Sequence, residues 1–249
     1  MSFARFQGLP RRVGWQYWYG DGKAHIAPAK LHVELVLDLQ TREFECREGM
    51  RPVIPADAKC LEIPFLEAFA WAPEYADYSA ARFARTGREY CQRFFGTVRG
   101  EWSPCSIIAE HQSEIIGAAL IKRRPQDHLL DCLFVAPRFA RQGWATAMVG
   151  HVIRQLLELG ETQLHSYVHL ANEPSLAWHR LFGFRELPNL RIAAHRWRAY
   201  EDELARCRAL GNTTELEIAK LEELAACWKA TVAQLSRTVQ PTDLEGELA

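Results

Sequence analysis

The chain has 249 residues, of which 48% are hydrophobic, and its 30 Lys and Arg residues are balanced by 31 Asp and Glu residues. This length allows one large domain or a medium domain with additions, and the balanced charge gives no general reason to expect a nucleic-acid partner. No run of about 18 apolar residues occurs, so neither a spanning helix nor a membrane partner is expected. No secretory leader is expected either, since the first residues lack an apolar core. The seven scattered cysteines form no CxxC pair and indicate reduced thiols in a cytoplasmic protein.

Residues 1–42 are predicted to form a strand-rich extension. Residues 1–10 are expected to be a loose arm, and residues 13–28 predict two strands joined at Gly20-Asp21-Gly22, a typical hairpin signal. Residues 30–40 alternate in a strand pattern. One face of that pattern is entirely apolar and expected to be buried, with Leu31, Val33, Leu35, Leu37 and Leu39.

Residues 43–190 predict the main domain. Residues 43–54 are predicted to form an extended run that ends at Pro55, and Asp57 is expected to cap a helix over 58–71 that bends at Pro64. Ser79 is expected to begin a second helix.

The second half of this domain alternates strands with helices. Three strand-like runs lie at 105–111, 114–124 and 128–137. They precede a helix over 143–160, a strand over 162–170 and a short helix over 173–183. This order predicts an α/β layer that is partly antiparallel, with a parallel crossover around the first of these helices.

Residues 191–249 predict a C-terminal extension of two helices. One apolar stripe runs from Trp197 to Cys207 and is closed by Gly211-Asn212, and a second runs from Leu221 to Leu235 before Pro241. Thr231 interrupts the second stripe, so a long coiled coil is not expected.

The stretch 134–150, "FVAPRFARQGWATAMVG", is typical of a turn from a strand into a helix. Backbone amides at a helix N-terminus point the same way and attract anions. Gly143 allows a ligand to approach the backbone because it has no Cβ. Amides from about Arg141 to Thr146 could therefore hold a pyrophosphate, although a packed strand–helix turn is an equally simple interpretation.

The neighbouring motifs favour the anion site. Val135-Ala136-Pro137, "ARQGWA" at 140–145, Asn172 and "WHRLFGF" at 178–184 follow one another in this order. Over residues 43–190 the sequence resembles the GNAT superfamily of acetyl-CoA-dependent N-acetyltransferases. Ala140 stands where the family usually has Gln or Arg, and Arg141 stands where it often has glycine.

The resemblance implies a GNAT-like mixed, largely antiparallel sheet with helices on both faces, extended by N-terminal strands and two C-terminal helices. It also implies that acetyl-CoA binds where the strands 127–135 and 163–170 separate, with the Val135 amide on the thioester carbonyl. Arg138 or Arg141 could pair with the CoA phosphates. The implied cofactor-binding residues are Phe134, Val135, Arg141, Gln142, Gly143, Trp144, Ala145, Thr146 and Asn172. Asn172 could equally be a helix cap.

Two residues are candidates for proton transfer. His179 occupies the position of the family's general acid, and it could protonate the leaving thiolate, fix a water molecule as neutral imidazole, or simply bond to the backbone. Asp131 is the candidate base, because a carboxylate amid "LLDCLF" is expected to be partly desolvated; a structural aspartate is the alternative. Period-2 geometry predicts Asp131, Leu133 and Val135 on one face and Cys132 on the other, so no nucleophilic cysteine is expected.

No metal is expected. His165 and His169 share a strand face but lie about 13 Å apart at ~3.3 Å per residue, too far to ligate one ion directly. His195 is a third candidate of the same kind.

The acceptor is expected to be a small-molecule amine or a protein amine. Carboxylates and aromatics between Glu62 and Tyr78 would suit a cationic amine, but packed aromatics and a solvated acidic face are the alternative. Two rival functions are a non-catalytic acyl-CoA-binding sensor or interaction module on the same fold, and an interaction protein acting through its tail helices. Those helices could cover the site or form a homodimer.

Overall fold

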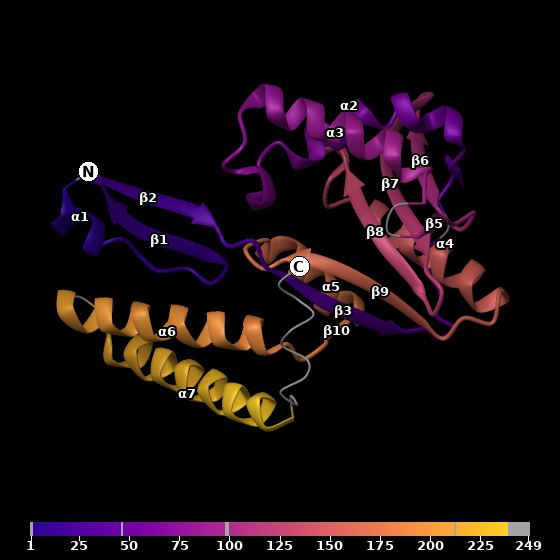
Figure 1. Cartoon of the computed structure of the whole chain (residues 1–249). Helices are drawn as coiled ribbons and strands as arrows, with labels where there is room; N and C mark the ends of the chain where they lie inside the picture. The colour runs from indigo at the N-terminus through magenta and orange to yellow at the C-terminus, as the bar shows by residue number, and fades with distance from the viewer. Residues whose placement is uncertain (1, 46, 98–99, 212, 239–249) are drawn as a thin grey trace. The chain divides into compact units, whose positions relative to one another are not determined.

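The computed structural model describes residues 2–45, 47–97, 100–211 and 213–238 (Figure 1). Its contacts divide the chain into two compact units. Unit 1 comprises Met1–Val33, His169–Glu173 and Leu187–Ala249, and unit 2 comprises Glu34–Val168 and Pro174–Glu186. The N-terminal and C-terminal segments therefore cluster together, whereas the sequence suggests three consecutive parts.

Unit 2 is built on a mixed sheet. Its strands are β3 (His32–Asp38), β4 (Met50–Pro52), β5 (Glu101–Trp102), β6 (Ile107–His111), β7 (Glu114–Arg123), β8 (His128–Val135), β9 (Gln163–His169) and β10 (Arg185–Glu186). The order is β10-β3-β9-β8-β7-β6-β4, with β5 paired to β7. Only β8 and β9 form a parallel pair among the registers described; β10–β3, β4–β6, β5–β7, β6–β7 and β7–β8 are antiparallel. The predicted mixed, largely antiparallel sheet is thus confirmed.

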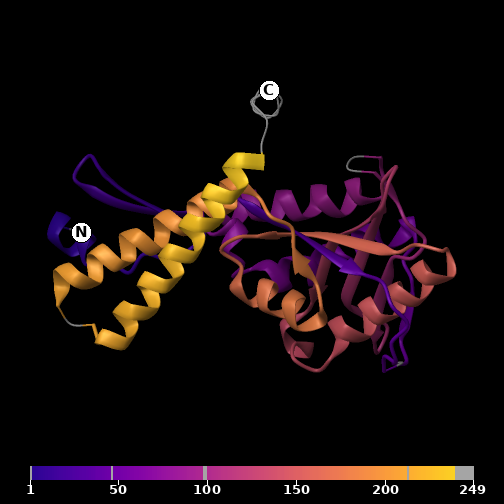
Figure 2. The same ribbon diagram turned by 90° about the horizontal axis from the view of Figure 1, so that it is seen from below.

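Helices cover both faces of this sheet (Figures 1 and 2). The helices α2 (Glu62–Phe69) and α3 (Ala80–Phe94) lie on one face, and α4 (Trp144–Glu158) and α5 (Glu173–Phe182) lie on the other. α4 follows β8 and leads into β9, so it makes the parallel crossover expected from the sequence. Ser79 caps α3 by accepting from the N–H of Arg82.

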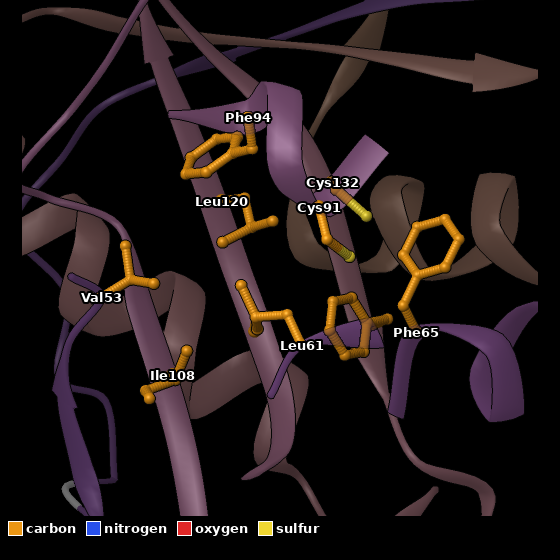
Figure 3. Packing of buried hydrophobic residues seen from close by; sticks show 10 residues of the cluster. Val53, Leu61, Phe65, Cys91, Phe94, Ile108, Leu120 and Cys132 are labelled. Carbon is orange, nitrogen blue, oxygen red and sulfur yellow. The ribbon is translucent and has the colours of Figure 1, made fainter. Parts of the chain in front are cut away.

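The core between the sheet and α2–α3 joins residues that are distant in sequence (Figure 3). Phe65 of α2 and Cys91 of α3 pack against Leu120 of β7 and Cys132 of β8. Leu120 is fully buried, and Phe65 is 2% exposed. Because this cluster buries apolar side chains from both helices and three strands, it holds β8 firmly beneath the helices.

Unit 1 contains α1 (Phe3–Gln7), the hairpin β1 (Trp15–Gly20) and β2 (Lys23–Pro28), and the helices α6 (Leu190–Leu210) and α7 (Glu215–Thr238). The Arg11 N–H donates to Glu203, and the Gly14 N–H donates to Nε2 of His195 at 3.2 Å. These bonds fasten the N-terminal arm to α6. The predicted tail helices are therefore present, and Gly211 ends the first of them with φ 63°; Asn212 and Pro241 lie outside the described residues.

The N-terminal arm differs from expectation. Residues 1–10 were expected to be loose, but Phe3–Gln7 form α1, where the Ser2 side chain accepts from the Arg5 N–H and Phe6 is 6% exposed. A short helix becomes stable here because its apolar side chain finds a tertiary partner in Tyr19, at a ring distance of 5.5 Å.

Asp57 also differs from expectation, because it does not cap α2. Asp57 lies in a 3₁₀ turn, Pro55–Lys59, and its carboxylate accepts hydrogen bonds from the Ile54 N–H and from Arg51. The guanidinium of Arg51 lowers the pKa of this buried carboxyl. α2 begins later, after Leu61, so Pro64 falls in its first turn, where proline is tolerated.

Within residues 2–45, 47–97, 100–211 and 213–238, no helix is long and apolar enough to cross a membrane. The six cysteines in these ranges are free thiols.

Candidate functional site

A gap opens between β8 and β9. Their parallel pairing covers three residue pairs, His128–Leu164, Leu129–His165 and Leu130–Ser166. Both strands are described throughout, and β8 continues unpaired on this side to Val135. The sheet therefore separates after Leu130, as the family resemblance implied.

The backbone direction of β8 decides which amides face this gap. The Ala136 N–H donates to the Ile116 carbonyl of the β7 side at 2.7 Å. Backbone groups alternate along an antiparallel pair, so Phe134 also faces β7, whereas the N–H groups of Leu133 and Val135 face the opposite side. Of the two predicted strand positions, Val135 thus presents its amide to the gap.

Phe134 serves the core instead. Its side chain is 4% exposed and contacts Phe65 and Phe69 of α2 edge to face. It supports β8 beneath the gap and does not line the gap itself.

The turn after β8 has the backbone form of an anion site. Gly143 is the N-cap of α4 with φ 84°, and no side chain accepts from the first helical amides. The amides of Trp144, Ala145 and Thr146 consequently keep their donors for a ligand. Arg141 also has a positive φ of 62°, the conformation that glycine adopts at little cost. The loop geometry therefore survives the departure from glycine at this position.

Arg47 lies at the same turn and was not singled out from the sequence. Its guanidinium carbon lies 5.0 Å from the centre of the Trp144 ring, and its Nη2 would lie 3.2 Å from a Cβ on Gly143. Nothing local to residue 47 signals this position, because the contact joins segments almost 100 residues apart.

Asp131 is placed by a β-bulge. Leu120 of β7 pairs with Cys132 and Ile121 pairs with Leu130, so Asp131 is the extra residue between them. Its carboxylate accepts from the Tyr90 hydroxyl of α3 at 2.7 Å. A bulge re-aims the side chain at which it occurs, and Asp131 consequently lies on the α3 face.

The bulge overturns the expected division of faces. Asp131 was expected to share a face with Leu133 and Val135, opposite Cys132, but Cys132 also lies beside the Tyr90 hydroxyl. Burial raises the pKa of the Cys132 thiol well above its usual range. The thiol is therefore protonated at neutral pH, which agrees with the expectation that it is not a nucleophile.

His179 lies in α5 next to the point where the strands part. Its Nδ1–H donates to the Ser175 carbonyl at 2.8 Å, and its Nε2 lies 3.1 Å from the hydroxyl of Ser166, the last β9 residue paired with β8. Burial lowers the pKa of His179 to about 4. The imidazole is therefore neutral at pH 7, with Nε2 free to accept from Ser166. This state favours the positioning roles over proton donation by an imidazolium.

Asn172, Gln142 and His165, which the sequence also singled out, make different kinds of contact. Asn172 belongs to unit 1 and directly precedes α5, where its N–H donates to the His169 carbonyl at 2.8 Å. Gln142 is exposed and donates from its side chain to the Arg138 carbonyl. His165 lies 3.3 Å from Glu34, and the described part of the chain contains no cluster of three or more side chains arranged for a metal.

The region expected to receive the acceptor, between Glu62 and Tyr78, contains buried, ion-paired and exposed side chains. Phe65 belongs to the core, and Glu62 pairs with Arg88 at 3.2 Å. Trp71 is 96% exposed, and burial raises the pKa of the half-buried Tyr75. The aromatic side chains here thus divide between packing and exposure, and the acceptor role stays a prediction.

The family comparison agrees with this geometry. Residues 63–184 match the model of the acetyltransferase (GNAT) family. This part of the chain belongs to the GNAT family. The family uses acetyl-CoA for acyl transfer, and the matched residues include α2, α3, the β8–β9 gap and the α4 turn. The comparison with curated proteins gave no significant match.

Several solved structures are similar to this chain. PaiA N-acetyltransferase from Thermoplasma acidophilum, solved with coenzyme A, is 18% identical over 56% of this chain and 91% of that chain, with a TM-score of 0.49. A GCN5-related N-acetyltransferase from Sphaerobacter thermophilus is 16% identical over 63% of this chain and 48% of that chain, with a TM-score of 0.45. The ribosomal-protein-S18-alanine N-acetyltransferase from Escherichia coli is 20% identical over 55% of this chain and 77% of that chain, with a TM-score of 0.42. Similarity at this level says nothing about the acceptor.

Proposed function

We propose that this GNAT chain transfers the acetyl group of acetyl-CoA to an amine by direct attack, without an acyl-enzyme. The observation that carries the proposal is the separation of β8 from β9 after Leu130, in a strand that leads directly to the uncapped turn at Gly143. An extended pantetheine arm needs free strand amides, and a pyrophosphate needs free helix amides. The chain offers both along one continuous segment.

The Val135 amide would stabilise the charge that develops on the thioester oxygen. Asp131 would accept the amine proton through a water molecule, while the Tyr90 hydroxyl holds the carboxylate in place. The N–C bond forms as the C–S bond breaks, and the departing thiolate takes its proton from solvent. Cys132 takes no covalent part.

His179 is proposed as a positioning residue. Its neutral ring bonds to the Ser175 carbonyl of α5 and to the Ser166 hydroxyl of β9, where the two strands separate. The ring would therefore fix the position at which β9 diverges from β8. This role needs no imidazolium and is compatible with the low pKa of the buried ring.

Isothermal titration of acetyl-CoA into the purified full-length chain, with CoA for comparison, is the first test. Micromolar binding of both ligands supports the proposed site. Release of free thiol from acetyl-CoA would then be followed across small amines, polyamines, amino sugars and peptides with free N-termini.

The outcomes separate the candidate functions. Binding with thiol release for at least one amine supports an N-acetyltransferase. Binding without release for any acceptor class would favour a non-catalytic acyl-CoA sensor. The absence of binding at millimolar ligand would overturn both functions.

A further inference from the structure

We propose that Arg47, which lies outside the phosphate turn in sequence, binds the CoA pyrophosphate by its guanidinium group. The inference rests on the proposed function and adds a specific side-chain cation to a turn that otherwise offers backbone amides. Its basis is the position of Arg47 against Gly143 and Trp144 at the first turn of α4.

The segment preceding Arg47 is fastened to the helices of the same face. The Phe44 ring occupies the space where Gly150 of α4 lacks a side chain, since a Cβ there would lie 2.3 Å from the ring. The same ring stacks on Phe182 of α5 with centroids 5.7 Å apart. Arg42 donates to the Phe182 carbonyl at 2.9 Å. Arg42 and Phe44 are thus held against α4 and α5.

Arg47 itself keeps unused binding capacity. Its ion pair is with Glu45 at 3.1 Å, and the Glu45 side chain is 71% exposed against 22% for Arg47. Exposed pairs of this kind contribute roughly 0–1 kcal/mol, so a phosphate group with more charge can displace Glu45. The Nε of Arg47 is inaccessible to water and has no acceptor among the described residues. An arginine that stacks on an indole and retains free donors is suited to bind phosphate oxygens in a fixed plane.

Other arginines near the turn are less suited. Arg138 is turned toward Glu114 at 3.0 Å, and the side chain of Arg141 is exposed. Arg47 is therefore the guanidinium that the fold places against Gly143 and the Trp144 ring at the start of α4.

The test uses Arg47→Met in the full-length chain, with Arg88→Met as the matched control. Arg88 belongs to the same unit and pairs with a single glutamate, Glu62, on the opposite face of the sheet. The titrated ligands are CoA and dephospho-CoA, which share the pyrophosphate and differ in the 3′-phosphate. Arg47→Met is expected to weaken binding of both ligands by about tenfold or more, because a charge-assisted bidentate bond is lost. Arg88→Met should leave both affinities within about twofold.

Two further variants keep the proposal testable if Arg47→Met folds poorly. Arg47→Lys retains the charge without the planar fork and should bind with intermediate affinity. Glu45→Gln removes the competing carboxylate and should tighten binding about two- to threefold. Circular dichroism would confirm the fold of each variant.

Three results would overturn the assignment. Equal affinities of Arg47→Met and the wild type would remove Arg47 from the site while leaving the proposed function intact. Weakening for CoA but not for dephospho-CoA would move the contact to the 3′-phosphate. If the wild type binds neither ligand, the proposed function fails as well.

Discussion

Asp131 owes its position to one extra residue in β8. Without the bulge, strand alternation would direct it away from Cys132, and the Tyr90 hydroxyl could not reach it. The bulge instead sets a carboxylate, a phenol and a thiol side by side beneath α3. The base role that we assign to Asp131 makes a direct kinetic prediction.

Asp131→Asn should lower the rate of thiol release by about 100-fold or more, since the amide retains the shape but cannot accept the proton. The affinity for acetyl-CoA should stay within about twofold. Both are measured with the first amine found to be active, by a thiol-release assay and by titration calorimetry.

Tyr90→Phe is the matched control, because it removes the bond that holds Asp131 without removing the carboxylate. Its rate should fall less than that of Asp131→Asn. An unaltered rate in Asp131→Asn would leave Asp131 as a structural residue only.

The buried His179 side chain should make the free energy of unfolding depend on pH. Burial lowers its pKa to about 4 in the folded chain, below the ordinary value of 6.5. Between these two values the unfolded chain binds a proton that the folded chain does not, so the free energy of unfolding falls as pH decreases from 6.5 toward 4. The full loss is about 3 kcal/mol.

Urea denaturation of the wild type and His179→Asn between pH 7.5 and 4.5 measures this effect. Burial also lowers the pKa of His128 and His151 in the same unit, so the quantity of interest is the difference between the two proteins. The variant should show the shallower decline. Parallel curves would mean that His179 is protonated as readily in the folded chain as in the unfolded one.

At the scale of elements, a buried lysine joins β7 to the end of α3. Lys122 is 1% exposed, and its ammonium donates to the carbonyls of Phe94, Gly96 and Gly100. Helix carbonyls at a C-terminus lack intrahelical partners and carry partial negative charge. Lys122 of β7 therefore supplies the hydrogen-bond donor for carbonyls at and after the C-terminus of α3. The sequence does not reveal this contact, because the two segments are distant along the chain.

Lys122→Met should lower the free energy of unfolding by about 2–4 kcal/mol, because three carbonyls lose their donor in a buried position. Arg123→Met is the control, since Arg123 is the next residue and pairs with Glu101 in solvent. It should change the free energy by less than about 0.5 kcal/mol. Urea denaturation followed by circular dichroism measures both; similar midpoints for the two variants would contradict the role of Lys122.

At the scale of the whole molecule, the chain forms two contact units, and Arg47, Asp131, Val135 and His179, to which we assign roles in the proposed site, belong to unit 2. Unit 1 has its own stabilising contacts. The largely buried Arg196 of α6 lies over the Trp228 ring of α7 at 4.5 Å, and Lys229 lies over Trp197. These contacts stabilise the pair of helices α6 and α7, and none of them involves a residue of the proposed acetyltransferase site.

Trp228→Ala should destabilise α6 and α7 by about 1–3 kcal/mol, because a half-buried indole and its cation contact are lost. Hydrogen exchange followed by mass spectrometry should show faster exchange in residues 190–238 and unchanged exchange in residues 107–168. The affinity for acetyl-CoA should not change. Faster exchange in both ranges would show that the two units unfold as one.

Bound acetyl-CoA should slow hydrogen exchange in unit 2. At 100 times its dissociation constant a ligand stabilises the folded state by about 2.7 kcal/mol. Slower exchange is therefore expected in residues 128–150, which contain β8 and the α4 turn. A ligand that protected only residues 190–238 would place the site elsewhere.

The sequence by itself determined the elements whose signals are local. Gly20-Asp21-Gly22 predicted the β1–β2 hairpin, Ser79 the start of α3, and Gly143 the start of α4. It also predicted the GNAT family, whose model matches residues 63–184. The helix start at Gly143 could be predicted because turn chemistry and helix ends depend on residues a few positions apart, whereas phosphate binding at that turn stays a prediction. The homodimer, the cytoplasmic location and the acceptor stay predictions.

Only the tertiary structure decided how distant residues meet. The register of β7 against β8 creates the bulge that turns Asp131 toward Tyr90, and a two-residue period read along one strand cannot contain that information. Phe44 packs against α4 and α5, and Arg47, three residues later, lies against Gly143. Burial makes His179 neutral, since the cost of a buried charge is set by the residues packed around it. Each of these outcomes depends on contacts between segments that the chain order keeps apart.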